Sequence, residues 1–441
     1  MRPIIKPQLL LIGLLGFFSG LPLALTASTL TAWLADEKVA RASIGLFAAI
    51  ATPYALKFLW APLLDGLRIP ILTQRLGRRR SWLLITQLLL ALSIAAMAVT
   101  NPAVNPWMTA LVGVIIASLS ATQDTAIDAY RVERLTPEQQ GNGAAWATFG
   151  YRIGMLVSGA GALYLADHVG WKMTYLIMAA VVASSLLITL IMREAVVSHR
   201  SPDTSKEEVS NRERFDPASL ATGDRRLATF LTDYVVAPFR DFMTRPMWLG
   251  VLAFVILYKL GDAFMGVMFN PFLLDIGFTK TQIAQVVKFY GLIATILGTF
   301  AGGWLVGHAG MFRSLLLCGF MHMLTNLLLV MQAQIGADVY FLTFTISLEN
   351  FTGGMSTAAF IAYLSALCRI NYTATQYALL SSLAAFGRTW LSTPSGALAE
   401  AVGWEVFFAI ASLMAIPSLI LLVWLERKKN TATLQQPRLS L

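Results

Sequence analysis

Apolar runs of about twenty residues, bounded by charges or by Gly, Pro or Asn, recur along the whole chain. A helix of ~20 apolar residues is long enough to cross the hydrocarbon core of a bilayer. The pattern therefore predicts an all-α integral membrane protein with twelve transmembrane helices. These helices are expected near residues 8–35, 44–64, 82–100, 106–132, 142–166, 172–192, 247–273, 281–307, 312–332, 338–366, 374–399 and 404–425.

The composition agrees with a membrane protein. Of the 441 residues, 56% are hydrophobic and 13% are charged, whereas a soluble domain has about a quarter of its residues charged. This balance excludes a soluble enzyme, a disordered tail and a secreted scaffold. Arg2 and Lys6 resemble the start of a signal peptide, but the apolar run after them continues to Leu34 and is too long for one. Cys318 and Cys368 lie in or at the end of apolar segments, which indicates buried thiols rather than a disulfide or a metal site.

Basic residues of the loops are concentrated on one side of the predicted crossings. Only four fall on the other side, namely Lys38, Arg41, Lys172 and Lys280. Because short basic loops stay in the cytoplasm, we expect a multi-pass membrane protein with both termini cytoplasmic. The net charge of +9 then reflects topology and contact with anionic lipid, and we expect no nucleic-acid partner.

A long polar stretch divides the chain into two halves. It predicts an N-terminal six-helix bundle (1–192), a cytoplasmic linker (193–246), and a C-terminal six-helix bundle with a short cytoplasmic tail (247–441). Apolar residues recur at helical spacing from Leu227 to Val235, which indicates either an amphipathic helix on the membrane face or a solvated linker. The halves also share a pattern: Phe149, Gly150, Arg152, Gly170 and Trp171 correspond to Phe386, Gly387, Arg388, Gly403 and Trp404. This indicates a parallel repeat, with chance similarity among Gly-rich helices as the alternative.

Nine ionisable residues fall inside the predicted crossings: Lys57, Asp124, Asp128, Arg152, Lys259, Asp262, Lys288, Glu349 and Arg388. At about 3 kcal/mol each, exposing all of them to lipid would cost more than a typical fold's stability. They are therefore expected to face one another or a water-filled cavity, as a solute pathway requires.

The fourth crossing carries the densest set of these charges. Asp124, Asp128 and Arg131 lie at i, i+4 and i+7 on one helical face, and Gln123 is adjacent to it. Two nearby carboxylates repel when both are ionised, which favours proton binding by one of them. The alternatives are a proton-coupling site and a structural ion pair with Arg131 or Arg152. Asp262 and Glu349 are the further candidates for proton coupling.

Other polar positions inside the crossings are candidate substrate contacts. In the first crossing, Pro22, Thr26, Thr29 and Trp33 share one face after the Ser19-Gly20 break, which suits either a sugar ring or helix packing. Tyr151 beside Arg152 adds an aromatic side chain to the first half. In the second half, Lys259, Asp262 and Asn270 share a face and the first two can pair locally. Glu349, Asn350 and Arg388 complete that polar centre.

The loop between the second and third crossings resembles the signature loop of the major facilitator superfamily. Asp65 is followed by Gly77-Arg78-Arg79-Arg80, and the resemblance implies that an Asp and basic residues latch the cytoplasmic side of the closed pathway. Ala61 stands where the signature has Gly, and about ten extra residues precede Gly77, so the latch geometry is an open point. The alternative is ordinary positive-inside charge.

Several strings resemble one branch of that superfamily, the AmpG-like muropeptide permeases, which are related to acetyl-CoA transporters. They are Gly16–Leu23, YALKFLWAPLLD (54–65), Gly77–Leu84, SATQDTAIDAYR (120–131) and GYRIGMLVSG (150–159). The resemblance implies proton-driven import of N-acetylglucosaminyl-anhydro-N-acetylmuramyl peptides from periplasm to cytoplasm across a bacterial inner membrane. It further implies that Gly20 and Pro22 shape the first crossing, that Gln123 and Asp124 contact sugar or peptide, and that Arg152 meets a substrate carboxylate.

The sequence therefore predicts a proton-coupled secondary transporter of anionic sugar-peptides for peptidoglycan recycling, and not an enzyme. A phosphate-binding G-x-x-x-x-G-K-[ST] loop, a paired-His metal motif and a G-x-S-x-G elbow are absent from the sequence. We expect no cofactor and no metal, a monomer, and protons, lipid and a small sugar-peptide as partners. The alternatives are a carrier of another bulky anion such as acetyl-CoA, and a non-transporting sensor of wall fragments.

Overall fold

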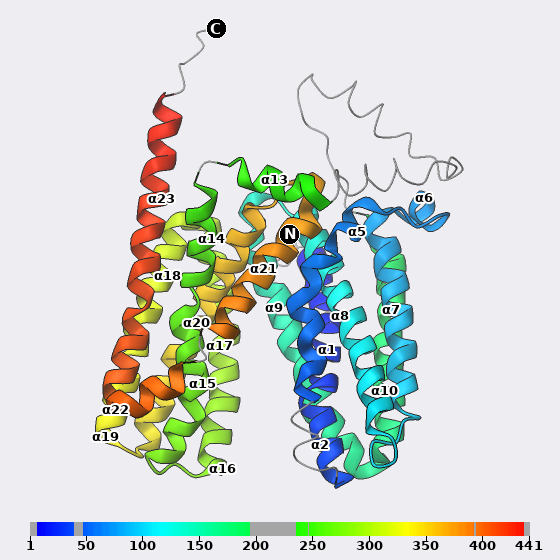
Figure 1. Ribbon diagram of the computed structural model, residues 1–441, viewed down its shortest axis with the longest axis horizontal. Helices are drawn as coiled ribbons and strands as arrows, with labels where there is room; N and C mark the ends of the chain where they lie inside the picture. The colour runs from blue at the N-terminus through cyan, green and yellow to red at the C-terminus, as the bar shows by residue number, and fades with distance from the viewer. Residues whose placement is uncertain (1–6, 39–46, 195–234, 246, 392–393, 436–441) are drawn as a thin grey trace, which may run out of the picture.

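The computed structural model describes residues 7–38, 47–194, 235–245, 247–391 and 394–435. These residues form helices and no strand, which confirms the all-α fold class. The helices make two bundles side by side, the N-terminal half and the C-terminal half of the chain (Figure 1). Apart from Val235, the possible amphipathic helix of the linker lies outside the described residues.

The N-terminal half begins with a long broken helix and ends with another. Its elements are α1 (Pro7–Thr26), α2 (Ser28–Asp36), η1 (Phe47–Ala51), α4 (Thr52–Leu56), η2 (Lys57–Leu59), α5 (Ala61–Gly66), α6 (Leu72–Leu76), α7 (Arg78–Met97), α8 (Pro106–Arg134), η3 (Pro137–Gln139), α9 (Gln140–Leu156), η4 (Val157–Gly161) and α10 (Ala162–Ile191). The extra residues between Asp65 and Gly77 form a bend and the short α6.

The C-terminal half follows the same order of long helices. Its elements are α13 (Ala237–Met243), α14 (Trp248–Leu257), α15 (Leu260–Asp275), α16 (Lys280–Ile283), η7 (Ala284–Tyr290), α17 (Gly291–Ala309), α18 (Met311–Asn326), α19 (Leu328–Ile335), α20 (Val339–Ala366), η8 (Ile370–Tyr372), α21 (Thr373–Trp390), α22 (Ser395–Leu413) and α23 (Ala415–Gln435). Both chain termini lie at one end of the molecule, here called the termini end (Figure 1).

Eight helical stretches among the described residues are long and apolar enough to cross a membrane, or nine if the bent pair Val339–Ala366 and Ile370–Gly387 is one span. One of the eight, Pro137–Ile191, has 55 residues and would be about 80 Å long if straight, far more than a ~30 Å bilayer core. It breaks at Gly170 (φ 76°), and α22 breaks likewise at Gly403 (φ 76°). Each break separates two of the crossings that the sequence predicts.

The two breaks carry the same contact in both halves. The Trp171 indole N–H donates to Asp36 Oδ2 at 2.8 Å, and the Trp404 indole N–H donates to Asp275 Oδ2 at 2.6 Å. In each half the Gly permits the left-handed backbone that the turn needs, and the following Trp reaches the end of that half's first long helix. We call these two contacts the Trp–Asp clasps.

Glycines let helix backbones touch within each half. A Cβ on Gly150 of α9 would lie 1.8 Å from the carbonyl oxygen of Gly13 in α1. A Cβ on Gly298 of α17 would likewise lie 1.8 Å from the carbonyl oxygen of Phe351 in α20. Such close approach is how helices gain packing energy in lipid, where no hydrophobic force drives association.

This packing yields a stability prediction. Gly150→Ala should force α1 and α9 apart and lower the unfolding free energy by about 1–3 kcal/mol, the usual cost of overpacking. The matched control is Gly161→Ala in the neighbouring η4, where a Cβ would have no atom within 4 Å. Thermal unfolding of the detergent-purified protein measures both variants. Equal unfolding temperatures for the two would contradict the packing argument.

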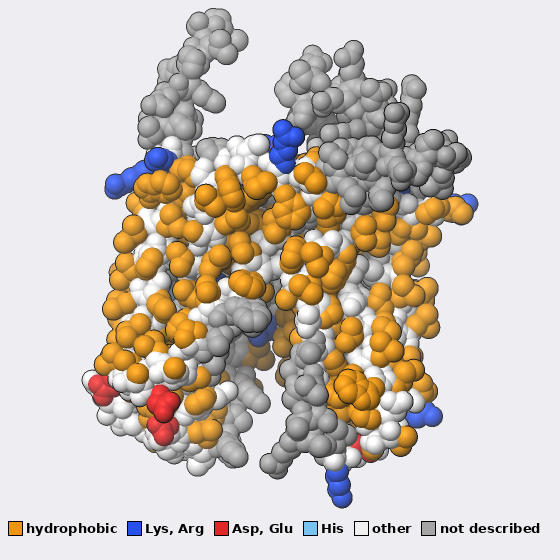
Figure 2. All heavy atoms as spheres, viewed as in Figure 1, with side chains coloured by type: hydrophobic (Ala, Val, Ile, Leu, Met, Phe, Trp, Pro, Cys, Tyr) orange, Lys and Arg blue, Asp and Glu red, His pale blue; other side chains and the backbone are white. Residues whose placement is uncertain are grey.

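The two halves pack on each other at and below the termini end. There, α9 packs on α17 and α20, and α21 packs on α5 and α8. A Cβ on Gly141 of α9 would lie 2.7 Å from the carbonyl oxygen of Gly303 in α17, so α9 and α17 also touch through backbone. At the opposite end the molecule is hollowed between the halves (Figure 2). The chain is therefore closed at the termini end and open at the other.

Candidate functional site

A buried ion-pair network joins the two halves at the termini end. Asp65, at the end of α5, accepts a hydrogen bond from Arg79 Nη2 at 2.7 Å, and both side chains are at most 1% exposed. Its other oxygen accepts from the backbone N–H and the hydroxyl of Thr375, both at 2.8 Å. Asp65 therefore caps the N-terminus of α21, where a negative charge is favoured by the helix dipole.

Two glutamates that the sequence reading missed complete this network. Glu133 of α8 is 2% exposed and receives hydrogen bonds from Arg79 Nε at 3.0 and 3.1 Å. Glu194 accepts from the backbone N–H groups of Arg79 at 2.8 Å and Arg80 at 3.1 Å, and so caps α7. Burial raises the pKa of the Glu194 carboxyl above its ordinary value. A network with every charge paired tolerates burial, whereas a lone buried charge does not.

The other two arginines predicted for the latch have different contacts. Arg78 Nη1 donates to the backbone oxygen of Asp65 at 2.8 Å and lies 3.6 Å from Glu133. Arg80 donates to the carbonyl oxygens of Thr189 at 3.0 Å and Leu190 at 2.6 Å, at the end of α10. Arg80 thus fastens α7 to α10 within one half.

A second contact between the halves is made by Arg131, which is 1% exposed. Its Nη1 donates to Ser365 Oγ of α20 at 3.0 Å, and its guanidinium lies 5.3 Å from the ring centre of Tyr377 in α21. The predicted pair with Asp128 is present but long, at 3.4 Å. Arg131 therefore serves mainly to hold α8 against the C-terminal half.

The short helix α13 covers the termini end beside this seam (Figure 1). Arg245, which follows it, pairs with Asp241 at 3.0 Å and donates to the carbonyl of Leu367 at the end of α20. Gln376 of α21 donates to Asp241 Oδ2 at 3.0 Å. The end of the linker is thus fixed to two helices of the C-terminal half.

The polar face of α8 continues from Arg131 in the seam to Asp128 and Asp124. Asp124 accepts a hydrogen bond from Ser19 Oγ of α1 at 2.6 Å and is partly exposed, as is Asp128 one turn later. Gln123 is fully buried and donates to the carbonyl oxygen of Phe18 at 3.0 Å. The two carboxylates therefore border accessible space, whereas Gln123 holds α8 on α1.

The candidates of the first crossing lie mostly in helix packing. A Cβ on Gly20 would meet the carbonyl oxygen of Tyr151 at 2.1 Å, so this position allows α1 to touch α9. Thr26 donates to the carbonyl of Pro22 at 3.0 Å, and Thr29 donates to that of Ser158 at 2.6 Å. Trp33 is 4% exposed and stacks on Trp171 at 5.9 Å. In this conformation these side chains are turned into the bundle.

Arg152, by contrast, is exposed, and the neighbouring Tyr151 is half-buried. Both lie in the stretch of α9 that packs on α1, since a Cβ on Gly150 or Gly154 would meet a carbonyl oxygen of α1. Of the cations predicted inside the crossings of the first half, Lys57 is half-buried and Arg152 is the more exposed. An exposed guanidinium at bilayer depth suits binding of an anionic solute.

The C-terminal half has its own polar centre, built around Asp262. Lys259 Nζ pairs with Asp262 Oδ2 at 2.9 Å, and His322 Nε2 contacts Asp262 Oδ1 at 2.9 Å. Glu349 accepts from the Asn350 amide at 2.7 Å, and Asn350 also accepts from Thr295 Oγ1 at 2.9 Å. Asn270 is exposed on the same helix as Asp262. The Arg388 side chain lies outside the described set.

Similarity to known proteins agrees with this architecture. The family model described as Major Facilitator Superfamily matches residues 12–392. The chain belongs to the Major Facilitator Superfamily. Within this superfamily it is 39% identical to the anhydromuropeptide permease of Escherichia coli K12 over 422 residues, which cover 95% of this chain and 79% of that protein. It is 37% identical to the protein named AmpG 4 of Rickettsia conorii over 421 residues, covering 95% and 96% of the two chains. These matches confirm the resemblance to AmpG-like permeases.

Solved structures confirm the facilitator fold. The Escherichia coli fucose:proton symporter FucP aligns with a TM-score of 0.67 at 15% identity, covering 95% of this chain and 98% of that one. The proton:xylose symporter XylE aligns with a TM-score of 0.65 at 14% identity, covering 94% of each chain. At these identities the likeness establishes the twelve-helix, two-bundle architecture of this facilitator.

Proposed function

We propose that this facilitator imports anhydromuropeptides, GlcNAc-anhydroMurNAc-peptides, from the periplasm to the cytoplasm together with protons. The observation that carries this proposal is the 39% identity with the Escherichia coli anhydromuropeptide permease along 95% of the chain. The polar groups around the hollow suit such a solute, because the peptide supplies carboxylates and the two sugars supply hydroxyls and amides.

The orientation proposed from the sequence is supported by the position of the basic residues. Arg134 at the end of α8, Arg313 at the start of α18 and Arg427 near the end of α23 all lie towards the termini end. If that end is cytoplasmic, the hollow in Figure 2 faces the periplasm and the present conformation accepts substrate from outside. One chain closes the pathway through its own two halves, which supports a monomer as the working unit.

We assign the site residues by what each side chain contacts. Arg152, Tyr151 and Asn270 are proposed to contact the substrate, with Arg152 binding a carboxylate. Asp124 and Asp128 supply the proton-sensitive face of the first half. Asp262 and Glu349 do the same in the second half, where Lys259 and Asn350 are proposed as further substrate contacts. Gly20, Pro22, Thr26, Thr29, Trp33 and Gln123 are proposed to position the helices around the site.

In the proposed transport cycle, the pathway opens at the termini end while it closes at the opposite end. Rotation of the halves would separate Asp65 from Thr375 and Arg131 from Ser365, and would bring the rims of the hollow together. The proton gradient drives this cycle inward if substrate release at the cytoplasmic face requires loss of a proton from the site.

Uptake into proteoliposomes tests the proposal. With labelled GlcNAc-anhydroMurNAc-tripeptide outside and an alkaline interior, we expect accumulation of about tenfold per pH unit for each coupled proton. Vesicles without a gradient should only equilibrate. Acetyl-CoA and unmodified GlcNAc serve as comparison solutes. Absence of muropeptide uptake together with uptake of acetyl-CoA would overturn the proposal in favour of another bulky anion.

A further inference from the structure

A histidine of the C-terminal half lies inside the polar centre at Asp262. His322 of α18 is buried, its Nε2 lies 2.9 Å from Asp262 Oδ1, and its Nδ1 lies 3.1 Å from Thr352 Oγ1 of α20. Asp262 Oδ2 is taken by Lys259 Nζ, which also lies 3.3 Å from the hydroxyls of Ser356 and Thr357. The imidazole thus links three helices, α15, α18 and α20.

The charges around His322 are unbalanced when its ring is neutral. The titratable and charged groups that face it are Asp262 and Lys259 from α15 and the preceding turn, and Glu349 from α20. From α22 and α23 it is faced by the hydroxyls of Ser412 and Ser418 across a shared cavity. With both carboxylates ionised, one cation leaves the cluster with a net negative charge, and an imidazolium would neutralise it.

The hydroxyl of Thr352 can serve either protonation state. It lies 3.1 Å from the carbonyl oxygens of both Leu348 and Glu349 and 2.7 Å from Thr325 Oγ1. When the imidazole is neutral, with Nε2–H donating to Asp262, Thr352 can donate to Nδ1. When the ring carries a second proton, Nδ1–H donates to Thr352, whose own hydrogen turns to its helix carbonyl. Each state therefore leaves His322 fully hydrogen-bonded.

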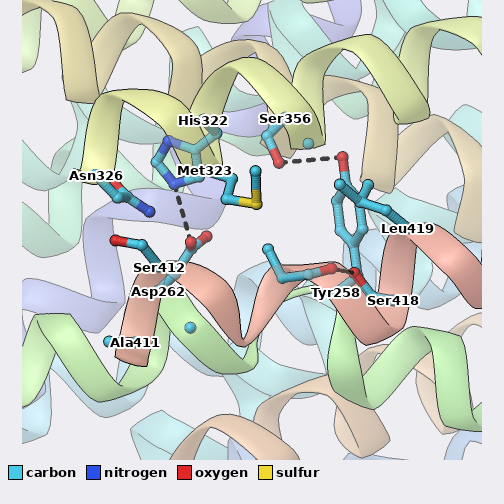
Figure 3. A pocket seen from close by; sticks show the side chains of 13 residues that line it. Tyr258, Asp262, His322, Met323, Asn326, Ser356, Ala411, Ser412, Ser418 and Leu419 are labelled. Carbon is cyan, nitrogen blue, oxygen red and sulfur yellow. Dashed lines mark hydrogen bonds and ion pairs between the residues drawn. The ribbon is translucent and has the colours of Figure 1, made fainter. Parts of the chain in front are cut away.

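A small enclosed cavity lies directly beside this pair (Figure 3). Its volume is about 10 Å³, and Asp262, His322, Asn326 and Ser412 line it together with Tyr258 and Ser356. That volume fits one water molecule. Asn326 is 3% exposed and its Oδ1 has no hydrogen-bond partner in the described part of the chain. A water here would donate to Asn326 and stand next to the Asp262–His322 contact.

We propose that His322, together with Asp262, Thr352 and one water in this cavity, forms a proton-binding site of the C-terminal half, separate from Asp124 in the N-terminal half. One proton from solvent adds to the neutral imidazole, and no other covalent bond changes. The Asp262 side chain is 30% exposed, so the site reaches solvent through it. In the protonated state two charge-assisted contacts tie α15 and α20 to α18. As a coupling element, the site rests on the proposed function.

The first test does not use transport. Unfolding temperatures of the purified protein, followed by tryptophan fluorescence from about pH 5 to pH 8, should show a step in the range where histidine titrates. His322→Gln keeps hydrogen-bonding groups but no titration in that range, and we expect it to abolish the step. The control His308→Gln changes an exposed ring stacked on Trp304 and should leave the step in place. A step of unchanged size and midpoint in His322→Gln overturns the proposal.

A second pair of variants keeps the histidine. Thr352→Val removes a contact to Nδ1 in both states, but the contact to the charged ring is the stronger one, so the midpoint of the step should move to lower pH, by about one unit. Thr352→Ser retains the hydroxyl and should restore the original midpoint, which loss of packing alone would not do. Identical midpoints in the wild type and Thr352→Val would overturn the proposal even if His322→Gln fails to fold.

Transport then shows whether the site participates in coupling. In proteoliposomes with a fixed inside-alkaline gradient, wild-type accumulation should depend on the outside pH through the same range as the unfolding step. His322→Gln should lose that dependence, and retention of the wild-type profile would overturn the role in coupling. If the wild type takes up no muropeptide, the proposed function fails, while the unfolding experiment still decides whether His322 binds the proton.

Discussion

Replacing Asp124 with Asn is expected to reduce gradient-driven accumulation of muropeptide from about tenfold per pH unit to simple equilibration. An amide of nearly equal size keeps an oxygen that can accept from Ser19 Oγ, the 2.6 Å contact that joins α8 to α1. It cannot bind and release a proton. The protein should therefore remain folded in the membrane while a proton gradient no longer drives uptake.

The measurement is uptake at several imposed gradients with a fixed substrate concentration. Asp167→Asn is the matched control, because Asp167 is an exposed carboxylate of the same half and should leave accumulation unchanged. Full gradient-driven accumulation in Asp124→Asn would move the coupling role to Asp128, Asp262 or Glu349. The unfolding step assigned to His322 should be unaffected by Asp124→Asn, since the two groups lie in different halves.

The second large effect is expected at Asp65. Asp65→Asn removes the charge that pairs with buried Arg79 and weakens the cap of α21. The conformation closed at the termini end should therefore be destabilised by about 3 kcal/mol relative to the conformation open there. That corresponds to more than a hundredfold change in the equilibrium between the two conformations. Transport should slow, because the outward-open state is depopulated.

Cys368 provides the measurement. It follows α20 within three residues of Ser365, the partner of Arg131, and is half-buried in the closed end, whereas Cys318 is fully buried in the core. Alkylation of Cys368 by a polar maleimide should accelerate at least tenfold in Asp65→Asn. Asp338→Asn is the matched control, because Asp338 also caps a helix, accepting from Phe341 N–H at 2.7 Å, but only within one half. Unchanged labelling in Asp65→Asn would refute the latch role.

The sequence predicted the fold well because crossings and their charges have strong periodic signals. Runs of apolar residues located the helices, and the cost of lipid-facing charges placed Asp124 and Asp262 in the interior. The resemblance to the facilitator signature loop indicated a latch between Asp65 and the basic residues Arg78, Arg79 and Arg80, although the inserted α6 obscured their spacing. A helix pair bent at Gly170 or Gly403 could also be located, since each glycine separates two apolar runs.

What the sequence did not give is the partner of each charge. Glu133, Glu194 and Thr375 belong to the Asp65 network but lie 68 to 310 residues from it in sequence, and Glu133 looked like an ordinary end-of-helix residue. His322 is one of four scattered histidines and attracted no prediction, although its place in the middle of an apolar run was a usable signal. Thr29 and Trp33 lie in helix packing in this conformation, one of the two alternatives that their spacing left open, because helical spacing alone does not say which neighbour a face meets.

The Trp–Asp clasps connect residues of one half only, and so do the glycine contacts between α1 and α9. None of them has to break when the halves turn against each other. The contacts that must break and re-form in one turnover are therefore those between the halves, such as Asp65–Thr375 and Arg131–Ser365. Substitutions there could change the rate of the transport cycle while leaving the packing of each bundle intact.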